Sequence, residues 1–297
     1  MHRLAVIATL AVLAAVPALA SESTTTPDRL QVPTAIIPNK ATYDVFLEDG
    51  KGMFVNARGT FTDVSKASCA GWNVEQRLYV QFVPPPARNG APTVPVYLRL
   101  GANTFESADG LKYTFEDMMS MRNQVLVSHK GEAVLSGVGQ AGKATFTKPQ
   151  ATTVDIPAGT IFPFAYVRNL TTAAGRGTAR YEAQVFDGSM ALEYGVVKMQ
   201  SFISNPMASR FKPQDQQGGN QRAGAPSLDR DFNATLSWPV RVNLMGKGAD
   251  GQAKRIAQQG YTLMPNGRAE DMIMDFGQFS LKFVLTKIEE LPKPTCR

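Results

Sequence analysis

The chain has few residues of the types that most enzymes use for chemistry. It contains two cysteines, and only one histidine, His129, lies beyond His2. No set of His, Cys, Asp or Glu residues has the spacing of a metal site, and neither a Gly-x-Ser-x-Gly elbow nor an EF-hand loop occurs. The sequence therefore does not indicate a metalloprotein, a serine hydrolase or a calcium sensor, and we expect no cofactor and no metal.

The remaining candidates for catalysis are weak. His129 lies in a strand-like segment, where a lone histidine is more often a surface residue than a base or a ligand. Glu116 and Asp117 are neighbours on a predicted strand, so their side chains point to opposite faces and do not form an acid–base pair. Glycan cleavage by two distant carboxylates stays open as a third function class, after two non-enzymatic ones. We expect that the protein is not an enzyme.

One glycine pattern resembles a nucleotide-binding motif but lacks its context. Gly137, Gly139 and Gly142 have the G-x-G-x-x-G spacing of dinucleotide-binding turns. That motif needs a following helix, whose N-terminus holds the pyrophosphate, whereas the strand-like KATFTK follows here. We therefore interpret these glycines as a hairpin turn.

Long apolar runs are absent except at the N-terminus. A positive start that includes Arg3 precedes the apolar run 4–15, and Ala18-Leu19-Ala20 forms a small-x-small cleavage site before Ser21. The run is too short for a bilayer span, which needs roughly 20 apolar residues, and Pro17 follows it. We predict a signal peptide over residues 1–20, cleaved between Ala20 and Ser21, with no transmembrane segment and the periplasm as the location.

Strong charge is also absent. The formal net charge is +6, and loss of Arg3 with the signal peptide leaves 6 − 1 = +5. No three Lys or Arg residues are consecutive, and we expect no nucleic-acid partner. The charge supports at most a weak preference for anionic envelope surfaces.

The two cysteines are expected to pair. In an oxidising compartment two cysteines without other candidates usually form a disulfide, because no thiol pool keeps them reduced. We therefore expect a bond between Cys69 and Cys296, with two buried free thiols or one reactive thiol as the alternatives. Small residues at Ala70 and Gly71 would let two backbones approach there, and the indole of Trp72 would cover the sulfurs. The bond would tie the end of the chain to its first third.

Strand signals dominate the rest of the chain. Alternating apolar residues occur in RLYVQF, DMIMDF and SLKFVL, and turn residues separate such segments. Asn266-Gly267 is the strongest hairpin signal. About a dozen strands or more, joined by short turns, predict an all-β fold that is a large antiparallel meander. We expect an extended lead-in over 21–40 and a single domain over 41–297.

Two segments depart from the strand pattern. TIFPFAYVRNLTTAAGRG predicts one helix, with Thr160 as its cap and Pro163 in its first turn, and we expect a plug or lid on the sheet in preference to a recognition helix. Residues 209–231 are rich in Gln, Gly and Pro and have little apolar surface to offset their ordering entropy. We predict a disordered insertion there, with a partner contact as the alternative.

The motifs in their order resemble the cell envelope integrity protein EipB family. They extend over essentially the whole chain after the signal peptide and comprise TYDVFL (42–47), Arg58-Gly59, CAGW (69–72), Arg77, GTIFP (159–163), VFDGS (185–189), WPV (238–240), Asn266-Gly267, MDFGQF (274–279) and LPKPTC (291–296). The resemblance implies about fourteen antiparallel strands wound as an incomplete, barrel-like β-spiral with one helix packed on it. It also implies a disulfide between the first-third and C-terminal cysteines.

The same resemblance implies a function without catalysis. It points to a role in cell envelope integrity and to cooperation with a periplasmic tetratricopeptide-repeat protein. The first function class is therefore an envelope protein that binds a periplasmic protein partner. The second is a carrier or sensor that holds a lipid-like amphiphile or a peptide in the concave cavity of the spiral. Lipid-mass adducts in native mass spectrometry would distinguish the second from the first.

Overall fold

The computed structural model describes residues 31–87, 93–211, 236–247 and 252–296 of the 297-residue chain. The expected signal peptide over 1–20, its cleavage site at Ala20 and Ser21, and residues 212–231 of the expected insertion lie outside the described residues. The first three residues of that insertion are described, and the Ser209 hydroxyl contacts the Glu270 carboxylate. Among the described residues, no helix is both long and apolar enough to cross a bilayer.

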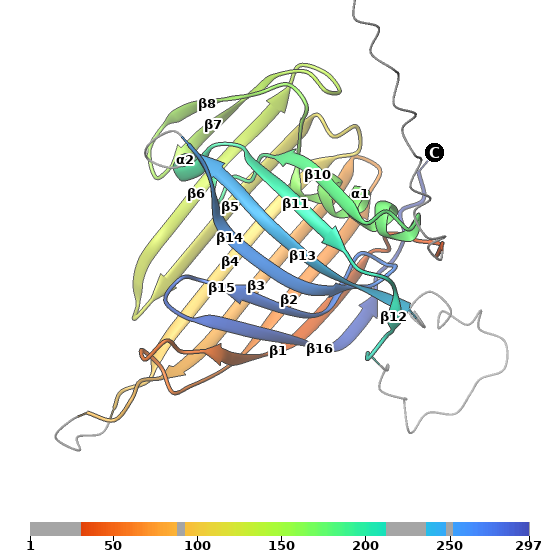
Figure 1. Ribbon diagram of the computed structural model, residues 1–297. Helices are drawn as coiled ribbons and strands as arrows, with labels where there is room; N and C mark the ends of the chain where they lie inside the picture. The colour runs from red at the N-terminus through yellow and green to blue at the C-terminus, as the bar shows by residue number, and fades with distance from the viewer. Residues whose placement is uncertain (1–30, 88–92, 212–235, 248–251, 297) are drawn as a thin grey trace, which may run out of the picture.

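Sixteen strands form one sheet in the described part of the chain, and the expectation of an all-β fold is confirmed (Figure 1). The strands are β1 (Asn39–Asp49), β2 (Asn56–Ser68), β3 (Gly71–Val83), β4 (Val96–Ser107), β5 (Lys112–Met121), β6 (Gln124–Leu135), β7 (Gly142–Lys148), β8 (Thr152–Ile156), β9 (Thr160–Ile161), β10 (Arg180–Val185), β11 (Val197–Ile203), β12 (Met207–Ala208), β13 (Leu236–Lys247), β14 (Ala253–Leu263), β15 (Ala269–Asp275) and β16 (Ser280–Glu290). The helices are α1 (Pro163–Gly175) and α2 (Ala191–Tyr194).

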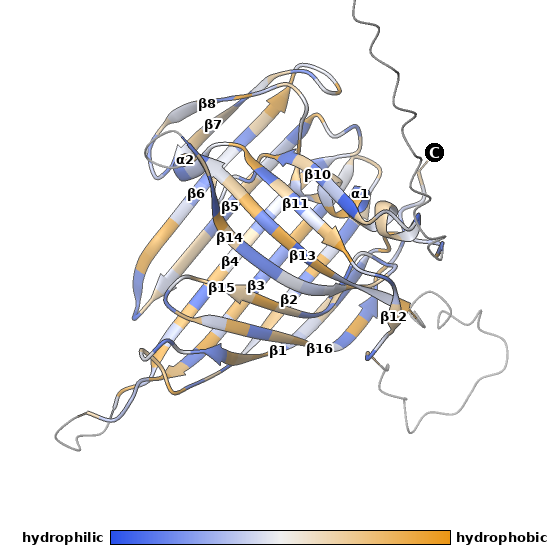
Figure 2. Ribbon diagram, in the orientation of Figure 1, coloured by the Kyte–Doolittle hydropathy of each residue, from blue (hydrophilic) through white to orange (hydrophobic). Residues whose placement is uncertain are grey.

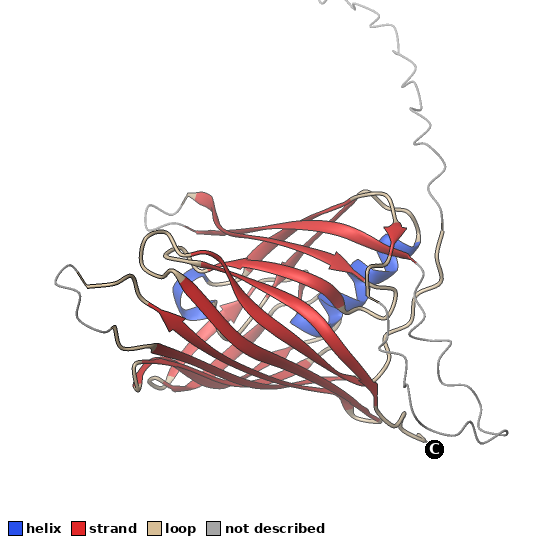
Figure 3. Ribbon diagram, turned by 90° about the horizontal axis from the view of Figure 1, so that it is seen from below, coloured by secondary structure: helices blue, strands red, loops and turns tan. Residues whose placement is uncertain are grey.

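The sheet winds into a nearly closed barrel. Its order is β8-β7-β6-β5-β4-β3-β2-β1-β16-β15-β14-β13-β11-β10-β9, with β12 beside β13. Neighbouring strands pair antiparallel, except that the short β9 runs parallel to β10. The pairing of β1 with β16 joins the first strand to the last, while β8 and β9 are the two free edges. Figure 3 shows the strands curving around the helices. The predicted antiparallel meander is therefore correct, and a seam remains between β8 and β9.

Buried and more exposed residues alternate along the strands, so that one face of the sheet forms the interior of the barrel and the other its outside. Ala41, Tyr43 and Val45 of β1 are buried, whereas the residues between them are exposed or half-buried. Successive strand side chains point to opposite faces, so each strand contributes one apolar row to the interior. The banding of apolar and polar residues along the strands is visible in Figure 2.

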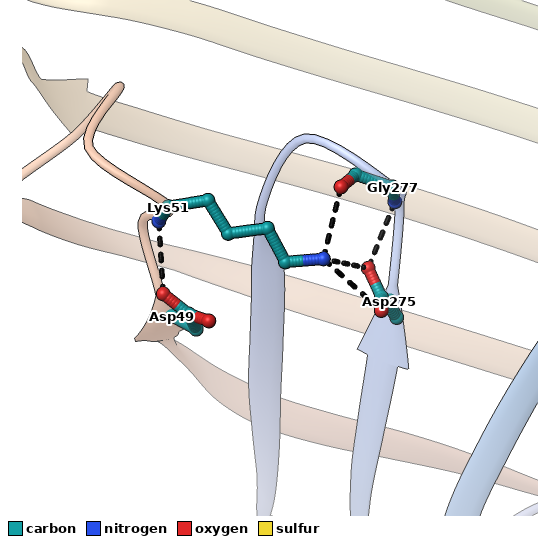
Figure 4. A network of polar contacts seen from close by, with 4 residues as sticks. All are labelled: Asp49, Lys51, Asp275 and Gly277. Carbon is teal, nitrogen blue, oxygen red and sulfur yellow. Dashed lines mark hydrogen bonds and ion pairs between the residues drawn. The ribbon is translucent and has the colours of Figure 1, made fainter.

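Aromatic side chains fill one end of the barrel. Phe54 lies 4.4 Å from Phe82 and 5.8 Å from Phe279 between ring centroids. At the same end Lys51 donates hydrogen bonds from Nζ to Asp275 Oδ1 at 2.9 Å and to the Gly277 carbonyl at 2.9 Å (Figure 4). We call this end the clamp rim, because the contact joins the β1–β2 loop to the β15–β16 hairpin.

The helices differ in two respects from the expectation. Thr160 does not cap α1, because it lies in β9 and Phe162 occupies the N-cap position without a side-chain hydrogen bond. Phe162 is fully buried, so the apolar residue anchors the start of the helix by packing. A second helix was not expected, but Ala191–Tyr194 forms α2, and β11 starts only at Val197. Gly195, with φ 67°, separates the two elements.

Both expected hairpin turns are confirmed. Asn266-Gly267 lies between β14 and β15, where the Met264 amide donates to the Arg268 carbonyl at 2.7 Å and Gly267 has φ 83°. The glycines of the G-x-G-x-x-G pattern form the β6–β7 turn, closed by a bond from the Ser136 amide to the Ala141 carbonyl at 3.0 Å.

The expected disulfide between Cys69 and Cys296 is present, with a Cα–Cα distance of 5.5 Å across a separation of 227 residues. Both cysteines are exposed. Gly71 permits a close approach as expected, but to a different segment, since a Cβ there would lie 2.0 Å from the Glu106 carbonyl of β4. Trp72 points inward on β3 and stacks on Phe164, so its indole packs on α1 and not over the sulfurs. We call the end of the barrel that carries the Cys69–Cys296 disulfide the disulfide rim.

Removal of the disulfide should destabilise the barrel. We expect Cys69→Ser and Cys296→Ser to lose roughly 2 to 5 kcal/mol of stability, which is a fall of several degrees in melting temperature for a domain of this size. Each single variant should match the double variant, since all three lose the same covalent link. Thermal melts with and without reductant measure this, with Ala70→Ser as the control. Melting curves that do not respond to reductant would contradict the expectation.

Candidate functional site

A cavity of about 390 Å³ lies in the interior of the barrel, between α1 and strands on both sides of the β1–β16 pairing. Phe61, Met272 and Met274 give it apolar walls. Its further lining residues come from β1–β5, β14, the β14–β15 turn and α1, and include Tyr43, Asp63, Trp72, Gln76, Glu106, Tyr113, Asp117, Tyr166, Leu170, Asn266 and Arg268. A space of this volume lies within the range of small-molecule sites.

Helix α1 covers the cavity and is held from two sides. Trp72 of β3 stacks on Phe164 with ring centroids 4.4 Å apart. On the opposite side, the hydroxyls of Tyr166 and Ser201 of β11 share a hydrogen bond of 2.6 Å. Because β3 and β11 lie far apart in the order of the sheet, α1 spans the interior. The expectation of a plug in preference to a recognition helix is therefore supported.

Glu106 of β4 caps the N-terminus of α1. Its Oε2 accepts a hydrogen bond from the Phe164 amide at 2.9 Å and its Oε1 accepts one from the Ala165 amide at 3.0 Å. These amides have no partner within the helix, and a carboxylate also matches the positive end of the helix dipole. Glu106 is only 5% exposed, and its burial raises the pKa of the carboxyl to about 7, although both hydrogen bonds and Arg168 oppose the shift.

A polar group around Arg268 lines the cavity near the disulfide rim. The guanidinium lies 2.6 Å from Asp63 Oδ1 and donates from Nε to Asn39 Oδ1 at 2.6 Å. Gln76 donates to the other oxygen of Asp63 at 3.0 Å. Two donors of this group, Arg268 Nη2 and Asn266 Nδ2, are buried and have no hydrogen-bond partner among the described residues. Buried donors without partners carry a free-energy cost of about 1 to 3 kcal/mol each.

A second part of the cavity lining is acidic and contains Glu106, Asp117 and Asp187 together with Tyr113. Burial is the largest cause that raises the pKa of Tyr113, and the three carboxyls raise it further. Asp117 Oδ1 is buried without a hydrogen-bond partner among the described residues. Burial raises the pKa of the Asp117 carboxyl above its ordinary value, while His129 opposes the shift.

His129 is not the surface residue that the sequence suggested. It lies opposite Asp117 across β5 and β6, with Nδ1 3.1 Å from Asp117 Oδ2. Its side chain is only 15% exposed, because its position on β6 faces inward, beside Phe146. Glu116, the neighbour of Asp117, points outward to Lys130, so these two carboxylates do lie on opposite faces. Within the described ranges, no three His, Cys, Asp or Glu side chains form a group suited to a metal ion.

A second feature lies on the outside of the barrel. Tyr79 and Tyr97, on neighbouring strands, are stacked with centroids 5.8 Å apart, and the Arg99 guanidinium lies 5.9 Å from the Tyr79 ring. The cross-strand register continues this row from Arg99 to Ser120 and Val125. An open groove of about 540 Å³ adjoins it, with Arg77, Gly101, Met118 and Lys148 in its lining. We call the surface of Tyr79, Tyr97, Arg99, Met118 and Val125 the outer β3–β6 surface.

Sequence reasoning found the disulfide but missed most of the cavity, and it placed the indole of Trp72 over the sulfurs, whereas Trp72 lines the cavity. Glu106 and Arg268 gave no local signal, because an isolated carboxylate or guanidinium is usually solvated. The one available indication was the Asn266-Gly267 turn, which places Arg268 directly before β15. The cavity lies beside α1, whereas the outer β3–β6 surface is on the other side of the sheet.

Three comparisons relate the chain to known proteins. A sequence model described as EipB-like matches residues 31–292. Among characterised proteins, the cell envelope integrity protein EipB of Brucella abortus is 24% identical over 261 residues, which cover 86% of this chain and 84% of that protein. Among solved structures, a β-barrel-like protein of a domain of unknown function from Brucella abortus has a TM-score of 0.69 at 23% identity, and the match covers 87% of this chain and all of that one. The structural match confirms the fold.

The buried carboxyl of Glu106 should make stability depend on pH. The pKa of Glu106 is about 7 in the folded chain and about 4.3 in an unfolded one. The stabilisation that this carboxyl adds to the free energy of unfolding is therefore fully present below about pH 4.3 and is lost as pH rises through 7. In Glu106→Gln this titration is absent. We expect the stability of the native protein relative to the variant to fall by about 3 kcal/mol between pH 4 and pH 8.

Urea unfolding across this pH range measures the difference. The control is Glu132→Gln, an exposed carboxylate that pairs with Lys112 on the outside of the barrel. A difference between native protein and Glu106→Gln that stays constant with pH would show that Glu106 titrates normally in the folded state.

Proposed function

The chain belongs to the EipB-like family, and from this premise we propose that it is a non-enzymatic periplasmic protein that supports cell envelope integrity by binding a periplasmic protein partner. The name of the Brucella relative supports the envelope role. The apolar run and cleavage site of residues 1–20 support export to the periplasm.

The proposal that the protein binds a partner is based on the outer β3–β6 surface. Tyr79 is 42% exposed, Tyr97 37% and Met118 49%, although tyrosine and methionine gain most from burial at an interface. Tyrosine and arginine are also the residues that most often dominate binding energy. An exposed stacked tyrosine pair with an arginine over one ring therefore has the composition of an interface centre.

The charge of this surface indicates the chemistry of the partner. Arg99 has a tyrosine ring beneath it, and no ion pair with a carboxylate occurs for it among the described residues. Lys130 and Lys148 both lie within 4 Å of the single carboxylate of Glu116. The net positive charge suits an acidic partner surface. The resemblance of the sequence points to a tetratricopeptide-repeat protein as that partner.

The interior cavity favours a second candidate function, a carrier or sensor. Its volume of about 390 Å³ and its apolar walls suit a lipid-like amphiphile or an apolar peptide. Lipid-mass adducts on protein isolated from the periplasm would support this second function, and it is compatible with a partner on the outer surface.

Loss of the outer surface should abolish partner capture without unfolding the protein. We expect the double variant Tyr97→Ala, Arg99→Glu to capture at least tenfold less partner in periplasmic crosslinking, since each anchor of an interface centre is worth about 2 kcal/mol. The variant should also fail to restore detergent resistance in a strain that lacks the protein. Both side chains are exposed, so the melting temperature should stay within about 2 °C of the native value.

Val134→Ser is the matched control, because Val134 is 46% exposed on the outside of β6 but lies outside the outer β3–β6 surface. The control should behave as the native protein does. Equal capture by the double variant and the control would overturn the assignment of this surface.

A further inference from the structure

We propose that the clamp rim binds a membrane surface that carries anionic phospholipids, with apolar side chains of its turns between the lipid head groups and basic side chains on the phosphates. This inference goes beyond the binding of a protein partner, and it uses neither the outer β3–β6 surface nor the cavity. It follows from where the fold places exposed apolar side chains and cations without ion pairs.

The first step is that four connections of the sheet lie side by side at the clamp rim (Figure 1, lower left). They are the β15–β16, β1–β2, β3–β4 and β5–β6 connections, whose strands are neighbours in the order of the sheet. Three hydrogen bonds join them in this order, from Lys51 Nζ to the Gly277 carbonyl, from the Val55 amide to the Val83 carbonyl and from the Arg122 amide to the Tyr97 carbonyl. The four connections therefore form one continuous arc.

The second step is that this arc exposes large apolar side chains. Five of them, all between 37% and 79% exposed, are Met53, Val55, Val94, Leu126 and Phe276, which we call the apolar arc. The turns at the disulfide rim, as far as they are described, expose one large apolar side chain, Val138. Apolar side chains can insert at the level of the lipid head groups, where the burial of each CH₂ favours binding. The clamp rim is therefore the end of the barrel that suits insertion.

The third step is that the clamp rim is basic. The ends of β13 and β14 lie at the same rim, because β14 runs antiparallel to β15 and pairs with β13. The exposed charged residues of the rim are the cations Lys51, Arg58, Arg122, Lys247, Lys254, Arg255 and Lys282 and the anions Glu48, Asp49 and Asp275. Their sum is 7 − 3 = +4. Of the seven cations, only Lys51 has an ion pair among the described residues.

The fourth step is that this combination suits a bilayer better than a protein. A protein interface needs a closely packed apolar centre, whereas the side chains of the apolar arc are distributed over separate turns. A second copy of the chain would bring two positive rims together, which is unfavourable. Lipid phosphates supply the missing negative charge, and each Lys or Arg near an anionic bilayer strengthens binding about fivefold. The fluid head-group layer also accommodates separate side chains.

Vesicle binding tests the inference. The mature protein is mixed with vesicles of phosphatidylcholine alone, or of equal parts of phosphatidylcholine and phosphatidylglycerol, and the bound fraction is measured by flotation. We expect binding to the anionic vesicles to be tighter by about tenfold or more, and to weaken as salt screens the charges. Equal binding to both kinds of vesicle, or binding to neither, would overturn the inference.

Charge variants locate the binding end. Arg122→Asn combined with Lys254→Gln removes two cations of the clamp rim, and Asn tolerates the φ of 51° at position 122. This variant should bind anionic vesicles about tenfold less tightly. The matched control, Lys66→Gln with Lys143→Gln, removes two exposed cations near the disulfide rim and should bind as the native protein does. Equal losses in the two variants would show that net charge alone attracts the protein.

Tryptophan substitutions measure insertion. Leu126→Trp and Met53→Trp place an indole on the apolar arc, and Val138→Trp places one at the disulfide rim, each at an exposed position. The native protein, with Trp72 and Trp238, gives the background emission. Anionic vesicles should shift the emission of the two arc variants to shorter wavelength and leave that of Val138→Trp unchanged. No shift in the arc variants, or the same shift in all three, would contradict docking by the clamp rim.

Discussion

The pairing of β1 with β16 is the constraint on which the rest of the structure depends. It joins strands that are more than two hundred residues apart, with Asn39 opposite Glu290 and Leu47 opposite Leu281. Long-range pairing of this kind carries a large loop-closure entropy. Two contacts support it at the two rims: the disulfide from Cys69 to Cys296 and the clamp from Lys51 to Asp275. The clamp is exposed and contributes little alone, so the covalent bond is the stronger of the two.

Closure of the sheet creates an interior that side chains must fill. At the clamp rim the aromatic group of Phe54, Phe82 and Phe279 does so. Toward the disulfide rim α1 fills the interior, since its buried residues Tyr166 and Leu170 pack against apolar residues of β10, β11, β13 and β14. The helix leaves a cavity between its own surface and the strands. The same geometry that stabilises the fold therefore provides an internal site.

Placing a helix inside a barrel buries the amide groups at its N-terminus, which then need partners. No side chain of α1 itself supplies one, and Glu106 of β4 does so instead. The arrangement costs desolvation of a carboxyl, and this raises its pKa to about 7. Gly71 belongs to the same arrangement, because its missing Cβ lets β3 approach the Glu106 backbone. A single carboxylate thus links the sheet to the helix that covers the cavity.

Each face of the sheet presents one candidate site, and the period of two along a strand keeps the two sites separate. On β5, Asp117 faces the cavity and His129, whereas the adjacent Glu116 and Met118 face outward. A substitution on one face can therefore change one feature without altering the other. This separation is what allows partner binding outside and ligand binding inside to be tested independently.

The sequence by itself determined the all-β class, the antiparallel meander, the hairpin at Asn266-Gly267 and the pairing of Cys69 with Cys296. These follow from local patterns, namely alternation, turn residues and a scarcity of cysteine, which need no knowledge of the distant chain. Only the tertiary structure decided that Glu106 caps α1, that Arg268 joins Asp63, and that His129 faces Asp117. Each of these contacts joins residues that are brought together by strand order and barrel closure. Whether a charged residue on a strand meets solvent or a partner depends on which face closure buries, and no local pattern carries that information.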